Sequence, residues 1–289
     1  MQTRVAIDNV IPEREPSHGS WEAELSLGFV RQGERTVLKH RTHRGPLAVQ
    51  RSLYPEGGTC HSHILHPPGG IVGGDALHVS ISVDKLSQAV VTTPGATRFY
   101  RSEGRVANVS QSFTVGPDAR LEFVPLENIA FPNAFLRTRT DVHLSSRSQF
   151  VGLDIWTLGQ PASKAHFDQG EIDGLTKVFV DERLVICERL RVNPRVWQQD
   201  AASLRGKSVS GTLIAYGSEE DFGSVCAWWK TQEVATDMMV GLTVIDGFLV
   251  MRGLSDSTEQ LFMLMANCWQ QIRLHWTGEL PELPRIWRT

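Results

Sequence analysis

The chain has 289 residues, of which 41% are hydrophobic and 21% charged, and this is the composition of a globular protein with a large buried core. Its formal net charge of -3 provides no positive field that would hold nucleic acid or an anionic membrane surface. No window approaches the roughly 20 apolar residues of a membrane span, and the N-terminus lacks the apolar core of a signal peptide. The four cysteines are scattered without a CxxC pair, which favours a reducing compartment. We therefore expect a cytoplasmic protein that binds neither nucleic acid nor membrane.

The chain is expected to form one domain after a short tail. Residues 1–20 are polar, interrupted by prolines and without period, so they are predicted to be a flexible N-terminal tail. No Pro/Ser/Gly-rich linker or run of charge divides the remainder, and residues 21–289 are predicted to fold as a single unit.

Alternating apolar and polar side chains dominate the first two thirds of this domain. The alternation starts at Trp21 and continues at Ala23, Leu25 and Leu27, which is the period of a half-buried strand. Further on, Asp246-Gly247 between two apolar runs predicts a tight hairpin. The composition and period therefore predict a mainly β protein. The other strand-like runs are TVLKH, LAVQRSL, HVSISV, AVVTT, RVANVSQSFTV, RLEFVPLE, VHLSS, QFVGLDIWTL, LTKVFV, LVICERLRV and SVSGTLIAY.

Two segments near the C-terminus replace this alternation with helical spacing. The first covers residues 218–233 and opens with a plausible capping pair at its first and fourth residues. The second covers residues 257–276 and opens with a Ser257 to Gln260 capping box. Both are predicted to be amphipathic α-helices. Their apolar faces are Phe222, Val225, Cys226 and Trp229 in the first, and Leu261, Met265, Cys268, Ile272 and Trp276 in the second.

The stretch LHPPGGIVGGD, residues 65–75, has the composition of a loop that holds something. It is not a phosphate-binding loop, because Asp75 stands where a Lys followed by Ser or Thr would be needed, and a carboxylate there would repel phosphate. No GxGxxG dinucleotide fingerprint is present either. From the residues alone, a rigid loop fixed by prolines and glycines is the favoured interpretation.

The preceding run CHSHILH contains candidate metal ligands. If it is a strand, His61 and His63 project from one face and His66 from the other, so only the first two can share a metal. Imidazole is a good ligand for nickel, zinc or copper. The carboxylates of Asp75 and Glu127 are further candidates, although nothing in the sequence places them together. The alternative interpretation is a solvated strand face with no metal role.

Several longer blocks of the sequence resemble one known family. They closely resemble the urease accessory protein UreD, called UreH in some systems, and the resemblance runs from about Trp21 to the last residue. The chain departs from the usual family blocks at Leu126 and Pro132 and across the 159–166 loop. The blocks that carry the resemblance are YPEG (54–57), LHPPGGIVGGD (65–75), TTPGATRFYRS (92–102), LEFVPLENIAFPNA (121–134) and PRIWRT (284–289).

This resemblance implies a function and a fold. The family implies a nickel-insertion chaperone without enzymatic activity that binds the urease apoprotein and works with UreF and the GTPase UreG. It also implies a β-helix-like stack of short strands with two helices, in one domain. Nickel would touch the chain only in transit, so no tightly bound cofactor is expected. The candidate residues for a transient nickel path are Asp75, Glu127, His61 and His63.

The C-terminal tail is the candidate partner-binding segment, because it is apolar and stiffened by proline. Its residues Pro284, Arg285, Ile286 and Trp287, together with the two helices, are expected to bind UreF, and a strand face is expected to bind urease. The main alternative is a metal-dependent hydrolase that uses His61, His63, Asp75 and Glu127. A structural subunit without a metal role is a further alternative.

Overall fold

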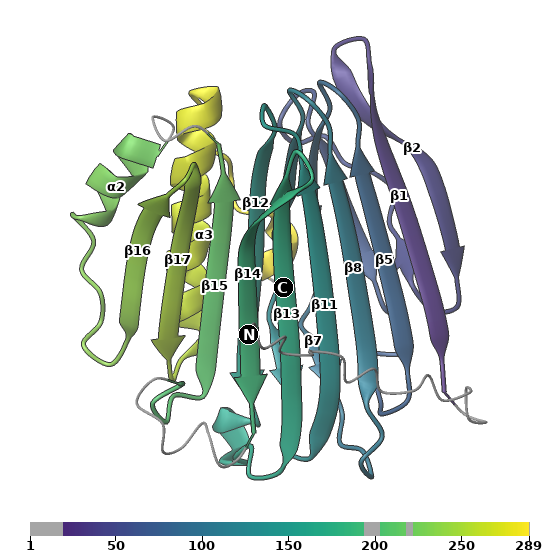
Figure 1. The fold of residues 1–289 in the computed structure, drawn as a ribbon, viewed down its shortest axis with the longest axis vertical. Helices are drawn as coiled ribbons and strands as arrows, with labels where there is room; N and C mark the ends of the chain where they lie inside the picture. The colour runs from purple at the N-terminus through teal and green to yellow at the C-terminus, as the bar shows by residue number, and fades with distance from the viewer. Residues whose placement is uncertain (1–19, 194–202, 218–221, 289) are drawn as a thin grey trace, which may run out of the picture.

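The computed structural model describes residues 20–193, 203–217 and 222–288. The predicted tail therefore lies outside the described residues, apart from residue 20. Within the described residues the strands form two large sheets (Figure 1). The seven-stranded sheet, here called the first sheet, has the order β14 (Arg183–Val192), β13 (Gly170–Val180), β11 (Ala134–Leu144), β8 (Ala107–Val115), β5 (Ala76–Val83), β1 (Glu22–Gln32) and β2 (Arg35–Arg44).

The second sheet has ten strands in the described part of the chain. Two short strands lie off its main path, where β10 (Asn128–Ala130) pairs with β12 and with β7 (Thr97–Phe99). Its main path has the order β16 (Met239–Ile245), β17 (Phe248–Ser255), β15 (Val209–Tyr216), β12 (Gln149–Leu158), β9 (Arg120–Phe123), β6 (Gln88–Thr92), β4 (Cys60–Leu65) and β3 (Ala48–Val49).

The chain winds as a β-solenoid through the middle of the molecule. From β4 to β13 the longer strands alternate between the two sheets, and neighbours within each sheet are parallel. Antiparallel strands close the solenoid at both ends, with β2 beside β1, and β15 to β17 beyond β12. This confirms the predicted mainly β stack of strands with two helices.

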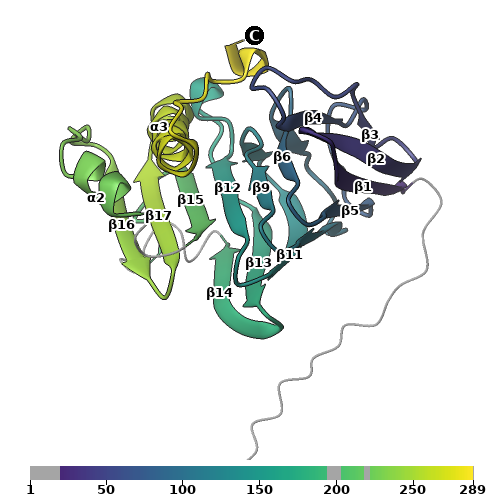
Figure 2. The same ribbon diagram turned by 90° about the horizontal axis from the view of Figure 1, so that it is seen from above.

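Helices add a third layer behind the second sheet. Helix α3 (Thr258–Thr277) lies along the outer side of that sheet, with α2 (Gly223–Trp229) beside it (Figures 1 and 2). Two short 3-10 turns, η1 (Pro161–Ser163) and η3 (Arg285–Arg288), complete the described elements. One apolar core lies between the two sheets, around side chains such as Leu25 and Phe113, and a second lies beneath the helices. The second sheet is therefore buried on both faces.

Local signals placed the C-terminal helix and hairpin correctly. The Ser257 side chain accepts a hydrogen bond from the Gln260 N–H, and α3 ends at Gly278 in the left-handed conformation. Its predicted apolar positions are buried, with Trp276 half-buried. The hairpin between β16 and β17 turns at Asp246 and Gly247, with φ values of 50° and 76°, as the sequence predicted.

Other boundaries differ from the prediction. Helix α2 is shorter than the predicted segment 218–233, whose capping residues Ser218 and Asp221 lie outside the described residues. The strand predicted at 47–53 is reduced to β3, whose two residues pair with β4, and Leu53 forms only an isolated bridge to His61. Trp21 precedes β1, and its side chain is 52% exposed. The alternating apolar residues that follow it along β1 are buried, as expected.

Candidate functional site

A cavity of about 920 Å³ lies between the two sheets, and its wall is mainly apolar with several polar groups. Strands of both sheets line it with inward-facing side chains, and so does the proline-glycine loop. Its hydroxyl, amide and carboxylate groups give it room and partners for water or a small ion. The polar side chains that matter most for this chemistry are Gln111, Thr138 and Thr140 from the first sheet, and Asn128, Asp154 and Thr212 from the second.

Among the described residues two carboxylates line this cavity: Glu188, which forms an ion pair with Arg252, and Asp154. Asp154 lies on β12, where one carboxylate oxygen accepts a hydrogen bond from Asn128 Nδ2 and the other from Trp156 Nε1, both at 3.0 Å. Its side chain keeps accessible surface, which lies in the cavity, although it is closely packed by surrounding protein atoms. This burial raises the pKa of Asp154, against the two hydrogen bonds that lower it. A carboxyl group with a raised pKa in an internal space is typical of a functional site.

The proline-glycine loop borders the same cavity through His66, Gly70 and Ile71. Ile71 exchanges backbone hydrogen bonds with the segment that follows β6, donating to the Arg98 carbonyl at 2.7 Å and accepting from the Tyr100 N–H at 2.8 Å. A Cβ atom on Gly70 would lie 2.1 Å from the Tyr100 ring, so only glycine permits this approach. These contacts attach the loop to the neighbouring segment, and it forms part of the cavity wall.

Asp75, the acidic end of this loop, is 3% exposed and bonded to backbone. Its Oδ1 accepts from the Trp21 N–H and its Oδ2 from the Val72 N–H, both at 2.9 Å. Both oxygens thus hold the loop and the start of β1 in place. Burial lowers the pKa of the nearby His66, and the charge of Asp75 opposes that shift. The loop imidazole is accordingly held neutral.

Glu127 is half-buried, and its carbonyl accepts a hydrogen bond from the Thr97 N–H at 2.9 Å. Neither Glu127 nor Asp75 is among the residues that line the cavity. No contact between the two is seen in the described part of the structure. Their role in a nickel path therefore stays a prediction, and the carboxylates that do line the cavity are Asp154 and Glu188.

His61 and His63 lie on β4, on one face as predicted, but that face is buried rather than solvated. His61 Nε2 lies 3.5 Å from a Glu56 oxygen, and His63 Nδ1 lies 3.1 Å from Gln50 Oε1. Burial, and to a smaller extent His61, lower the pKa of His63. Among the described residues no group of three His, Cys, Asp or Glu side chains is placed to hold a metal. The quartet of the hydrolase alternative is thus not assembled there.

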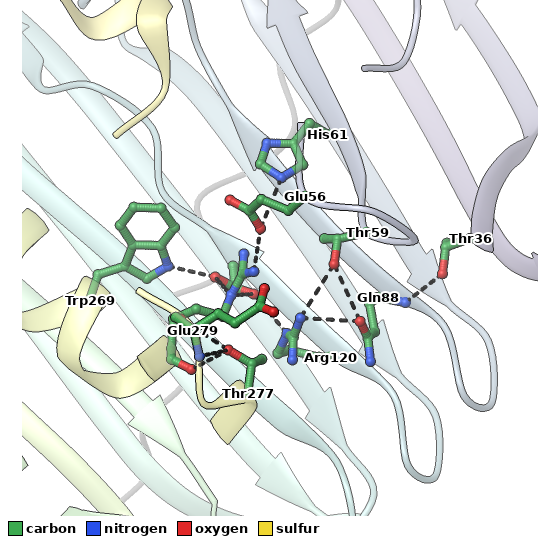
Figure 3. A network of polar contacts seen from close by, with 11 residues as sticks. Thr36, Glu56, Thr59, His61, Gln88, Arg120, Trp269, Thr277 and Glu279 are labelled. Carbon is green, nitrogen blue, oxygen red and sulfur yellow. Dashed lines mark hydrogen bonds and ion pairs between the residues drawn. The ribbon is translucent and has the colours of Figure 1, made fainter. Parts of the chain in front are cut away.

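A buried network of charges joins helix α3 to the solenoid (Figure 3). Its centre is Glu122 on β9, which is fully buried. Glu122 accepts from Arg273 Nε at 2.8 and 3.0 Å and from Trp269 Nε1 at 2.6 Å, and it forms an ion pair with Arg120 at 2.8 Å. Arg273 also binds Glu56, in the loop before β4. The network balances two carboxylates against two guanidinium groups.

Electrostatics keep this network charged. Burial alone would raise the pKa of Glu56, but the hydrogen bond from His61 and the charge of Arg273 outweigh it and lower that pKa to about 2. Burial would lower the pKa of Arg273, yet Glu122 and Glu56 together raise it. Because each charge depends on its neighbours, the network fixes the position of α3 on the second sheet.

The C-terminal tail folds back onto the same helix. The Trp287 ring packs at right-angled or tilted geometry against Phe262 and Trp269, with centroid separations of 5.0 and 5.6 Å. Trp287 Nε1 donates to Thr92 Oγ1 at 2.9 Å. Of the four residues predicted to bind a partner, Arg285 is exposed, and Pro284 and Ile286 are half-buried beside it. Trp287 anchors the tail, and partner binding by this segment stays a prediction.

Sequence reasoning missed Asp154 and the charge network. The sequence did contain a sign that Asp154 is unusual, because it is an acidic residue inside the mainly apolar run QFVGLDIWTL. A strand with one face in solvent would instead show regular alternation of apolar and polar residues. The charge network left no such sign, because Glu122 and Arg273 are 151 positions apart. No described helix is long and apolar enough to cross a membrane.

The fold and the cavity define a β-solenoid protein with an internal space lined by apolar and polar groups and a helical outer layer. The family model described as UreD urease accessory protein matches residues 22–288. Urease accessory proteins UreD of Aliivibrio fischeri strain MJ11 and of Escherichia coli are 37% and 39% identical to this chain. The alignments cover 96% and 94% of this chain and 100% and 99% of those relatives. This chain is a member of the UreD urease accessory protein family.

Proposed function

We propose that this chain is a cytoplasmic, non-enzymatic chaperone that binds the urease apoprotein and, with UreF and the GTPase UreG, supports nickel delivery to urease. Family membership supports the role in urease maturation. The observation that carries the nickel part is a carboxylate, Asp154, that faces the cavity between the two sheets and, unlike Glu188, is hydrogen-bonded to neutral donors rather than to an arginine.

The chemistry of the cavity suits an ion that passes through. A carboxylate oxygen with neighbouring hydroxyl groups attracts a divalent cation but binds nickel less tightly than several imidazoles would. The raised pKa of Asp154 weakens its hold further, because a proton competes for the same oxygens. His66, whose pKa is lowered, offers a neutral imidazole in the same wall. Nickel is therefore cargo, and no tightly bound cofactor is proposed.

Two surfaces serve the protein partners in this proposal. UreF binds the helical layer, where α2, α3 and the tail from Pro284 to Trp287 meet. The urease apoprotein binds a strand face on the opposite side. Trp287 and the buried charge network hold the helical layer rigidly on the solenoid, so it presents a preformed surface.

The test is urease activation in a heterologous cell that carries the cognate urease operon. The variants are the intact gene, its deletion, Asp154→Asn, and Asp84→Asn as a matched control in an exposed turn. We expect the deletion to leave abundant urease that is nickel-poor and inactive. Asp154→Asn should lower urease nickel content by about tenfold, the scale on which the loss of one group around a metal acts. The control should match the intact gene.

Two outcomes would contradict this reasoning at different levels. Full urease activity in the deletion strain would refute the chaperone function itself. Inactive urease on deletion combined with normal nickel content for Asp154→Asn would refute only the path through the cavity. Asp75→Asn and Glu127→Gln, assayed alongside, decide whether the two carboxylates outside the cavity take part.

The hydrolase alternative makes a separate demand. It requires tight, stoichiometric metal binding and turnover by the isolated chain. The chaperone proposal requires neither, so metal analysis of the purified protein together with a hydrolysis assay separates the two.

A further inference from the structure

The outer face of the first sheet carries an unusual concentration of arginine. In Figure 1 this face lies toward the viewer, and no described helix covers it. The strand register places two guanidinium-bearing rows side by side on β11, β13 and β14. We call this surface the arginine face, and it consists of the rows Arg137, Asp173, Arg191 and Arg139, Leu175, Arg189.

One carboxylate serves most of these arginines. Asp173 lies 2.8 Å from Arg139 Nη2, 3.1 Å from Arg189 Nη2 and 3.9 Å from Arg137 Nε. No ion pair is seen for Arg191 in the described part of the chain. Four positive charges against one negative charge leave a local excess of three. Because Asp173 braces the guanidinium groups, they are ordered before any partner arrives.

Exposure and composition distinguish this region from the rest of the same face. The side chains of Arg137, Arg139 and Arg189 are 36%, 34% and 51% exposed, so the arginines can be reached. On the same face His143 stacks on Phe179 with centroids 4.8 Å apart. Arginine and aromatic residues are enriched at protein interfaces.

The other half of the face has a different character. Over β1, β5 and β8 many of its outward side chains are small hydroxyl groups, such as Ser26, Ser80 and Ser112, which lie in one row. Of the two rows beside the arginines, the one that pairs Asp141 with Lys177 adds no net charge, and the one that pairs Phe135 with Glu171 adds one negative charge. The positive excess is therefore confined to one patch near the β14 edge.

We propose that the arginine face docks an acidic protein surface, and that the protein which carries this surface is the urease apoprotein. This inference rests on the proposed function. Guanidinium groups bind carboxylates through two parallel hydrogen bonds, and arginine is the residue best suited to such pairs at an interface. A protein fits better than a nucleic acid, because Leu175 offers an apolar contact within the patch and the formal net charge of -3 provides no extended positive field for a phosphate backbone.

The test compares charge reversal at two edges of the same sheet. Arg189→Glu/Arg191→Glu converts the local excess of three in these two rows into a deficit of one, whereas Lys39→Glu/Arg41→Glu makes the same charge change at exposed positions of β2. Binding of the full chain, with its accessory partners, to the urease apoprotein is measured by pull-down and interferometry at low and high salt. We expect the first pair to weaken binding by about tenfold or more and to remove its salt dependence. The second pair should bind like the unmodified chain, and both should melt like it.

Asp173→Asn separates recognition from a structural role. If the arginines recognise an acidic partner, Asp173→Asn removes their ordering contact but also a competing carboxylate, so binding should weaken far less than with the arginine pair. Weakening by Asp173→Asn as strong as that of the arginine pair would overturn the inference, because the arginines would then only shape the sheet. The inference would also be overturned if Arg189→Glu/Arg191→Glu left binding to the apoprotein unchanged, or if this pair weakened only the retention of nucleic acid. If the unmodified chain fails to bind the apoprotein, the proposed function is refuted and this inference with it.

Discussion

Arg273→Met tests whether the buried charge network holds α3 on the solenoid. The methionine fills similar space but leaves Glu56 and Glu122 without their shared cation. The Arg273 side chain is only 4% exposed, so water cannot replace the lost pairing. Removal of one partner from a buried ion pair costs about 3–5 kcal/mol. At about 2 °C per kcal/mol, the lower end of the range for large domains, the unfolding midpoint should fall by about 6–10 °C.

A matched control isolates the effect of burial. Arg44 also forms two ion pairs, with Glu22 and Glu24, but its side chain is 55% exposed. Arg44→Met should therefore cost about 1 kcal/mol or less. Both variants are measured by circular dichroism during thermal and urea unfolding of the full chain.

A double-mutant cycle tests the coupling directly. Glu122→Gln combined with Arg273→Met should destabilise the protein by less than the sum of the two single changes, since each single change already breaks the same pair. Additive effects, or an Arg273→Met variant that melts with the Arg44→Met control, would show that the network contributes little to the position of α3.

Three further predictions concern individual residues. The lowered pKa of Glu56, about 2 against an ordinary value of 4.5, means that its stabilising charge is complete above about pH 4.5 and is lost as the pH falls toward 2; Glu56→Gln should flatten the acid-unfolding curve in this window. Gly70→Ala places a Cβ atom 2.1 Å from the Tyr100 ring and should cost about 1–3 kcal/mol in urea unfolding, with Tyr100→Ala restoring space for it. Ser257→Ala removes the N-cap of α3 and should cost about 1 kcal/mol, whereas Ser257→Asp should retain most of the stability by differential scanning calorimetry.

Features that depend on neighbouring residues were predictable. The cap of α3 at Ser257 and the hairpin at Asp246-Gly247 each require only a few adjacent side chains, and both appear where the sequence indicated. The alternation of β1 also held, because one face of the first sheet is solvated and the period of two is preserved. Local chemistry was sufficient for these elements.

Features that depend on distant pairing were not predictable. The Glu122 and Arg273 pair joins β9 to a helix that forms near the end of the chain, and a lone glutamate in LEFVPLE gives no sign of it. Asp75 was a reasonable candidate for an ion path from composition, yet its oxygens are taken by backbone N–H groups that only the folded loop brings near. Asp154, which does face the cavity, lies on β12, and this strand was predicted from its apolar residues alone.

The second sheet explains why its acids are hard to interpret from sequence. On β12, Val151 packs beneath the helices while Asp154 faces the cavity, so this strand meets a different environment on each side. The register pairs Val151 with Glu122 and Asn128 with Trp156, which puts Glu122 on the helix side and Asn128 on the cavity side with Asp154. A carboxylate beneath α3 must be paired with buried cations, as Glu122 is. A carboxylate that faces the cavity needs only neutral hydrogen-bond donors beside it, as Asp154 has. Because side chains alternate, a shift of either acid by one position along its strand would transfer it to the opposite environment, where its partners are missing.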